Sequence, residues 1–145
     1  MLAIGSDHGG FELKEKVISH LKQRGFEVKD FGTYENKSCD YPVYGRAVAE
    51  SVASGESDKG IVICTTGLGI SMTANKVKGI RCAVCSDTVS AKLTRLHNDA
   101  NVLSMGAGII GENLAISIVD TFLDTEFSGE ERHQRRINQI EPERY

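Results

Sequence analysis

The chain has 145 residues, of which 40% are hydrophobic and 26% are charged, and its formal net charge at pH 7 is −3. A chain of this length forms one domain with a single core, and its composition excludes a disordered, fibrous or disulfide-rich protein. The charge gives no overall attraction to nucleic acid or to an anionic membrane, so we expect a small molecule as the partner.

Targeting signals and cysteines indicate the compartment. The sequence begins without the basic leader of a signal peptide, and no apolar run approaches the roughly 18 residues that span a bilayer. We therefore expect a cytoplasmic protein without membrane contact. In that compartment we expect four free thiols, at Cys39, Cys64, Cys82 and Cys85.

Apolar runs of strand length alternate with segments of helical periodicity along the chain. In chain order, we expect a strand at 2–6, a helix at 11–24, a strand at 27–31, a helix at 41–54, a strand at 60–64, a helix at 71–77, a strand at 80–84, a helix at 88–97, a strand at 101–105 and helices at 111–123 and 130–140. Asp87 is expected to cap the start of the helix at 88–97.

This alternation of apolar strands and amphipathic helices indicates a parallel sheet that is covered on both faces. The expected fold class is therefore α/β, with three layers in the order helix, sheet, helix. Residues 1–145 contain no linker and no repeat, so we expect one domain. The charged helix at about 130–140 is expected to pack across the site or against a second subunit.

The segment IVICTTGLGIS, residues 61–71, ends an apolar strand at Cys64 and continues into a turn with glycines and threonine hydroxyls. Such a turn before a helix can present N–H groups to a phosphate or to the oxyanion of an enediolate. A thiol beside it can act as a base or a nucleophile. The turn lacks the features of ATP-binding and NAD-binding loops. The alternative is a plain strand-to-helix connection with a packed cysteine.

Two further pairs of polar residues stand at the ends of elements. Asp7 and His8 follow the first strand and precede two glycines, which allow a ligand to approach the backbone closely. Asp7 can equally cap the next helix. His97 and Asn98 end a helix, where the histidine can act as a general acid or can simply cap the helix.

Arg132 and Arg136 lie four residues apart on one helix face, a spacing that can clamp a phosphate, although a solvated helix face is the alternative. Cys82-x-x-Cys85 has the spacing of a redox or zinc motif. Residues three apart in a strand point to opposite faces, and no second cysteine pair or nearby histidine completes a zinc site. We therefore expect neither a metal nor a cofactor.

Six motifs, in this order, resemble the type B ribose-5-phosphate isomerase family, which also contains galactose-6-phosphate and allose-6-phosphate isomerases. They are SDHGG, DYP at 40–42, ICTTGLGIS, ANKVKGIR, HNDAN at 97–101 and RHQRR. The resemblance extends from Met1 to about Ile140. The chain departs from most members at Thr65, where glycine is usual, and at Gly108, where many members have an arginine.

This resemblance implies a Rossmann-like fold with a five-stranded parallel sheet in the order 2-1-3-5-4. It also implies a homodimer, or a tetramer of two dimers, with each site at the subunit interface. Cys64 would be the base that moves a proton between C1 and C2 of the sugar. The enediolate would be held by the Thr66 side chain and by the N–H groups of Thr65, Thr66, Gly67, Leu68 and Gly69.

The resemblance also assigns roles to the other candidate residues. His97 would open the furanose ring with the help of Asp7, and Asn98 would bind a sugar hydroxyl. The phosphate would be bound by His8, Arg132 and Arg136.

We therefore expect an aldose–ketose isomerase that interconverts ribose 5-phosphate and ribulose 5-phosphate through an enediolate. An isomerase of a six-carbon sugar phosphate, galactose 6-phosphate or allose 6-phosphate, is the first alternative. A phosphosugar-binding module without catalysis is the second, and a thiol-redox enzyme that uses Cys82 and Cys85 is the third.

Overall fold

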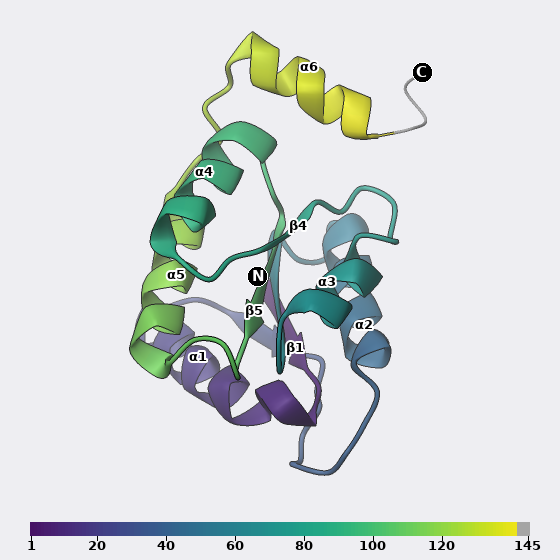
Figure 1. Ribbon diagram of the computed structural model, residues 1–145, viewed down its shortest axis with the longest axis vertical. Helices are drawn as coiled ribbons and strands as arrows, with labels where there is room; N and C mark the ends of the chain where they lie inside the picture. Colours follow the sequence, from purple (N-terminus) through teal and green to yellow (C-terminus); the bar gives the residue numbers. More distant parts are fainter. Residues whose placement is uncertain (142–145) are drawn as a thin grey trace.

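A single five-stranded parallel sheet forms the centre of the computed structural model, which describes residues 1–141 (Figure 1). Its strands are β1 (Leu2–Ser6), β2 (Val28–Asp30), β3 (Lys59–Cys64), β4 (Cys82–Val84) and β5 (Val102–Gly106). They are hydrogen-bonded in the order β2-β1-β3-β5-β4, and every neighbouring pair is parallel. The expected fold class and strand order are confirmed.

Helices cover both faces of the sheet (Figure 1). They are the 3-10 turn η1 (His8–Gly10) and the α-helices α1 (Phe11–Gln23), α2 (Tyr41–Ala53), α3 (Leu68–Ala74), α4 (Thr88–Asn98), α5 (Glu112–Asp124) and α6 (Glu131–Ile140). Buried residues of α1, α4 and α5 form one core with the sheet, and those of α2 and α3 form the other. The layers are therefore helix, sheet and helix.

The central strand β3 is buried on both faces, because its side chains alternate between the two cores. Ile61 and Ile63 pack into the core of α1 and α5, whereas Val62 and Cys64 pack into the core of α2 and α3. β3 pairs with β1 on one side and with β5 on the other. Cys64 thus ends the innermost strand, where parallel strands present their carboxyl ends to ligands.

α3 begins earlier than the helix expected at 71–77. It runs from Leu68 to Ala74, and Gly67 precedes it in the left-handed conformation, with φ +77°. Ser71 Oγ donates to Leu68 O at 2.6 Å, which ties the first turn of the helix together. The glycine-bearing turn is therefore shorter than the sequence indicated, and the helix N-terminus lies close to Cys64.

α6 lies apart from the two helical layers, across the end of the molecule where the strands begin (Figure 1). Its main neighbour is α4. Two of its side chains, His133 and Ile137, are buried, while most of the others face solvent. Within residues 1–141, no helix combines the length and the apolar character needed to cross a bilayer.

Candidate active site

Cys64 ends β3, and its sulfur turns toward the loop that follows. The N–H group of Gly67 donates to Cys64 Sγ at 3.1 Å. This hydrogen bond holds the sulfur against the loop. The Cys64 side chain is only 5% exposed, whereas Thr65 and Thr66 next to it are exposed. The thiol therefore lies at the base of the loop, with little contact with bulk water.

Gly67 has a conformation that gives the loop its shape. Its φ is positive, and a Cβ on this residue would lie 2.8 Å from the carbonyl carbon of Met105. The buried hydroxyl of Ser104, on β5, donates to Gly67 O at 2.6 Å. Both polar groups of Gly67 are thus fixed, the N–H by Cys64 and the C=O by Ser104.

The N–H groups of the loop differ in their availability to a ligand. The N–H of Gly67 is held by Cys64, and the N–H of Leu68 donates to Thr66 Oγ1 at 3.2 Å. Those of Thr65 and Thr66 donate to no acceptor within residues 1–141. The N–H of Gly69 likewise donates to no acceptor among these residues, so of the five N–H groups expected to bind an anion those of Thr65, Thr66 and Gly69 are the open donors.

Asp7 and His8 stand beside this loop, in the turn after β1. Asp7 is buried, and its Oδ1 accepts from the N–H of Gly10 at 3.1 Å, so it caps the 3-10 turn η1, whereas the expected alternative, a cap on the next helix α1, falls to Gly10. His8 Nδ1 accepts from the N–H of Cys39 at 3.2 Å. Because Nδ1 is an acceptor, the ring proton of neutral His8 is on Nε2, which can donate to an anion.

A buried lysine stabilises the segment that holds His8. Lys14 is fully buried on α1, and its Nζ lies 2.7 Å from both carboxylate oxygens of Asp30. It also lies 5.5 Å from the ring centroids of Phe11 and Tyr34. Asp30 ends β2, and Tyr34 belongs to the connection that continues to Cys39. The ion pair therefore ties this connection to α1.

His97 occupies the last turn of α4 and contacts α6. Its ring stacks on that of His133, with the two centroids 4.4 Å apart and the planes inclined by 17°. The side chain of His133 is buried against α4, although charged residues surround it in the sequence of α6. The helix α6, which was expected to pack across the site, therefore holds the ring of His97 in place through this stack.

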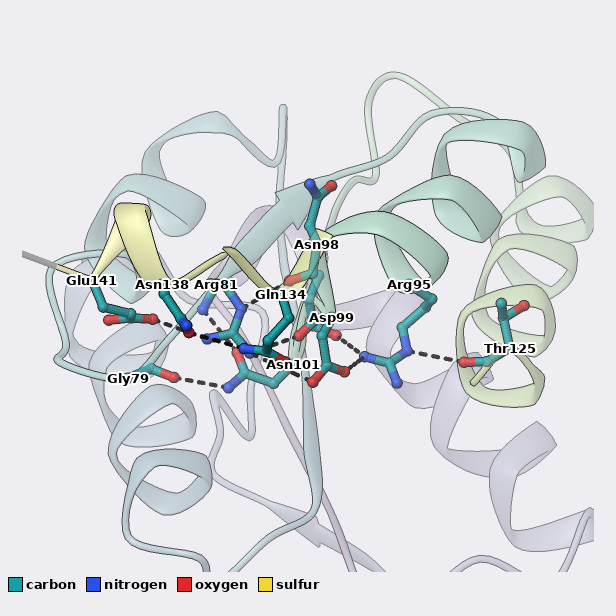
Figure 2. A network of polar contacts seen from close by, with 11 residues as sticks. Gly79, Arg81, Arg95, Asn98, Asp99, Asn101, Thr125, Gln134, Asn138 and Glu141 are labelled. Carbon is teal, nitrogen blue, oxygen red and sulfur yellow. Dashed lines mark hydrogen bonds and ion pairs between the residues drawn. The ribbon is translucent and has the colours of Figure 1, made fainter. Parts of the chain in front are cut away.

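Arg81 holds Asn98 through its main chain, and the side-chain amide lies away from that network (Figure 2), where its Oδ1 accepts from Thr94 Oγ1 at 3.1 Å. Arg81 Nε donates to Asn98 O at 2.9 Å, and Arg81 also binds Asp99 O and Glu141. Asp99 has φ +43°, a conformation that is uncommon for residues other than glycine, and Arg95 binds its carboxylate at 2.7 Å. Two arginines thus fix the turn that ends α4.

Arg132 and Arg136 lie on the exposed face of α6. Arg132 Nε is 3.0 Å from Glu130 Oε2, a surface ion pair of small energetic value. Arg136 forms no hydrogen bond or ion pair with another described residue. Within one chain these two guanidinium groups therefore face solvent rather than a shared anion.

The candidate residues form two groups at opposite edges of the sheet. Cys64 is aligned with Gly106 at the carboxyl ends of β3 and β5, together with the turn of Asp7 and His8. The α4 turn that contains Asn98 binds Arg81, whose carbonyl accepts from the N–H of Asn101 at the amino end of β5. The four steps between the first and last residues of β5, at about 3.3 Å each, separate these edges by roughly 13 Å.

Cys82 and Cys85 do not form a joint site. Cys82 packs against the core of α2 and α3, whereas Cys85 is buried in the core on the other face of the sheet. Burial raises the pKa of both thiols, and that of Cys85 reaches about 11. All four cysteines are free, as expected. Among residues 1–141 no three histidine, cysteine or carboxylate side chains are grouped to hold a metal ion.

Three supporting contacts were not foreseen from the sequence. Ser104 fixes Gly67, the Cys39 N–H orients His8, and His133 stacks on His97. Each joins segments that are between 31 and 37 residues apart. The sequence offered a signal for only one of these contacts. Ser104 lies inside an apolar strand, and a buried serine hydroxyl needs a hydrogen-bond partner.

The family model for ribose/galactose isomerases matches residues 2–140 of this chain. The chain belongs to that family. Ribose-5-phosphate isomerase B of Escherichia coli (strain K12) is 50% identical over 139 residues, which are 96% of this chain and 93% of that relative. A solved structure of Clostridium thermocellum ribose-5-phosphate isomerase B is 55% identical, covers 97% of this chain and 95% of its own, and has a TM-score of 0.96.

The ribose/galactose isomerase family also includes a relative named for a six-carbon sugar. Galactose-6-phosphate isomerase subunit LacB of Clostridium acetobutylicum (strain ATCC 824) is 41% identical over 141 residues, which are 97% of this chain and 82% of that relative. The family resemblance stated from the motifs is therefore confirmed. Because the family contains members named for both sugars, the substrate of this chain has to be argued from the residues of its own site.

Proposed function

We propose that this protein interconverts ribose 5-phosphate and ribulose 5-phosphate. The relatives named for ribose 5-phosphate include two that are 50% and 55% identical, and others with that name are as low as 37% identical; the relative named for galactose 6-phosphate is 41% identical. The observation that carries the proposal is the position of Cys64. Its sulfur lies 3.1 Å from one loop N–H group, next to two N–H groups that are open to a ligand.

Cys64 is the proposed base. In open-chain ribose 5-phosphate, a base takes the proton from C2 and returns it to C1, while a proton passes from O2 to O1. The aldehyde becomes an alcohol and C2 becomes a ketone, so no oxidant or other reactant is consumed. The intermediate enediolate carries negative charge on oxygen. The N–H groups of Thr65 and Thr66 and the hydroxyl of Thr66 are placed to stabilise that charge.

The other proposed roles draw on both groups of residues. His97, with Asp7, moves the protons needed to open the furanose ring, and Asn98 binds a sugar hydroxyl. His8 donates to the phosphate through Nε2, together with the guanidinium groups of Arg132 and Arg136. Gly67, Leu68 and Gly69 complete the loop around the enediolate.

We infer that a second copy of the chain completes each site. One group lies at the carboxyl ends of the strands and the other at their amino ends, so one chain cannot bring both groups to the same sugar. A two-fold dimer with antiparallel sheets places the carboxyl edge of one chain against the amino edge of its partner. Exposed apolar side chains around the edge strand β4 suit such a contact, namely those of Met72, Val84, Val89 and Leu93.

This arrangement gives α6 the role expected for the helix at 130–140. It would carry Arg132 and Arg136 across to the Cys64 group of the partner subunit. Light scattering of the purified protein tests the assembly, and a molar mass of two chains, or of four if dimers pair, is expected. A protein that stays monomeric while it isomerises the sugar would contradict the shared site.

The activity is tested by proton NMR with ribose 5-phosphate in deuterated water. We expect ribulose 5-phosphate to form and solvent deuterium to enter the exchanging carbon. Galactose 6-phosphate and allose 6-phosphate are assayed in parallel, because turnover of these alone would support the six-carbon alternative. Thermal stabilisation by ribose 5-phosphate without turnover or exchange would identify a binding module and refute the proposed activity.

A further inference from the structure

The side chain of Thr65 lies across the gap between two turns at the carboxyl edge of the sheet. Its Oγ1 is 2.3 Å from the position that a Cβ on Gly9 would take, in the turn after β1. Its Cγ2 is 3.0 Å from the corresponding position on Gly108, in the turn after β5. Thr65 is exposed and follows Cys64 directly. One threonine side chain therefore fills the space beside the proposed base.

The walls on either side of Thr65 are fixed. Gly108 N–H donates to Thr65 O at 2.8 Å, and Ala107 N–H donates to Cys64 O at 2.9 Å. On the opposite side, a Cβ on Gly10 would lie 2.6 Å from Ile63 O, so the turn after β1 packs directly on β3. Because neither turn can move away, the size of the side chain at position 65 sets the free space between them.

A ligand that contacts both Cys64 and His8 must lie over Thr65. Gly9, which Thr65 contacts, is the chain neighbour of His8, and Asp7 Oδ1 is 3.3 Å from the same Cβ position on Gly9. The sugar chain thus passes the threonine between the proton-transfer end and the phosphate end of the site. Each added carbon with its hydroxyl needs room at this point.

We propose that Thr65 is a specificity-determining residue that restricts this site to five-carbon sugar phosphates by filling the gap between Gly9 and Gly108. The inference rests on the proposed function, since it concerns the chain length of that substrate. A pocket that has no room for one extra carbon group discriminates between two substrates that differ by this group by about 10-fold to 200-fold.

Three variants test the inference. Thr65→Gly empties the gap, Thr65→Ser removes only the methyl group next to Gly108, and Thr65→Val keeps the shape of the side chain while removing its hydroxyl. The measured quantity is the ratio of kcat/KM for ribose 5-phosphate to that for allose 6-phosphate. We expect Thr65→Gly to lower this ratio by about 10-fold or more, Thr65→Ser to lower it less, and Thr65→Val to keep it within about 3-fold.

A binding measurement separates this inference from the proposed activity. The affinities of the aldonate analogues 5-phosphoribonate and 6-phosphogluconate are measured by calorimetry for wild type and Thr65→Gly. A shift of the affinity ratio toward the six-carbon analogue, about 10-fold, supports the role of Thr65 even in a protein without turnover. An unchanged ratio in Thr65→Gly, or a wild type that prefers the six-carbon compound, overturns the role of Thr65. Absence of isomerisation overturns the proposed activity instead.

Discussion

The imidazole of His133 stacks on that of His97 at a centroid distance of 4.4 Å. His133 Nε2 is buried and has no hydrogen-bond partner among residues 1–141. Burial, followed by the charges of His97 and Arg132, lowers the pKa of His133. His133 therefore faces His97 as a neutral ring, which can orient His97 without competing for its proton.

The lowered pKa of His133 predicts a loss of stability in acid. Between pH 6.5, the ordinary value of a free imidazole, and the lower native value, the unfolded chain binds a proton that the native chain does not bind. The stability that neutral His133 contributes is thus lost as pH falls through this window. His133→Phe keeps a flat ring without the titrating nitrogen.

Urea unfolding at pH 7.5 and pH 5.5, at one protein concentration, measures this effect. We expect wild type to lose more unfolding free energy between the two pH values than His133→Phe does. His133→Ala, which also removes the stack, is expected to lower kcat at both pH values because His97 is no longer held. Equal acid destabilisation of wild type and His133→Phe would refute the role of His133 as the titrating group.

Removal of the Ser104 hydroxyl is predicted to loosen the loop after Cys64. Ser104→Ala leaves the buried carbonyl of Gly67 without its donor, which costs on the order of 1–3 kcal/mol of stability. Because the N–H of the same residue donates to Cys64 Sγ, we expect kcat to fall as well. Ser54→Ala is the matched control, since Ser54 Oγ also donates to a carbonyl, that of Ser51, far from the site.

The outcome that separates the two roles of Ser104 is the comparison of stability with rate. A Ser104→Ala protein that is destabilised yet keeps full kcat for ribose 5-phosphate would show that the bond supports the fold alone. Ser54→Ala is expected to change both quantities little, because its bond is only partly buried.

Arg136 is predicted to contribute to phosphate binding, whereas its neighbour Arg135 is not. Arg135 pairs with Glu131 on the surface of α6 at 3.1 Å, and Arg136 forms no such bond within residues 1–141. Loss of one charge-assisted contact costs about 1.5–3 kcal/mol, so Arg136→Ala should raise KM for ribose 5-phosphate by about 10-fold to 100-fold. Arg135→Ala should stay close to wild type. Equal KM values for the two variants would contradict the assignment.

The thiols are predicted to differ in their rates of alkylation. Burial, and then the charge of Asp87, raise the pKa of Cys85 to about 11, so at pH 8 very little of this thiol is the reactive thiolate. Cys39 is partly exposed. Mass spectrometry of the folded protein treated with iodoacetamide should therefore find Cys39 modified well before Cys85. A disulfide between Cys82 and Cys85 in native protein would contradict their placement on opposite faces.

The layered fold was predictable because the length of the apolar runs, together with periodicity, distinguishes buried strands from amphipathic helices. The run from Ile61 to Cys64 has no polar residue and is buried throughout, as expected for a central parallel strand. The start of α3 was misjudged by three residues, because the loop glycines concealed a helix that begins at Leu68. The strand order came from the family resemblance rather than from periodicity, which does not record how strands pair.

The candidate site was only partly predictable, because a local motif does not show whether its residues lie at the carboxyl ends or at the amino ends of the strands. Cys64 is the last residue of one strand and Asp7 follows the neighbouring strand, so their meeting at the carboxyl edge follows from parallel pairing. His97 ends a helix that returns to the opposite edge, and only the structure shows its stack on His133. Contacts of this kind depend on tertiary packing between segments that are distant in the chain.

The central claim is that each site takes Cys64 from one chain and His97 from its partner. Heterodimers with two different tags, purified by both tags, test it most directly. A dimer of a Cys64→Ala chain with a His97→Asn chain has one site with both residues intact, so we predict about half of the wild-type activity. The matched control joins a wild-type chain to a chain with both substitutions. If sites are shared, each of its two sites is defective and the control is inactive. A control that retains half of the activity, together with an inactive first heterodimer, would show that each chain builds its own site and would contradict this account.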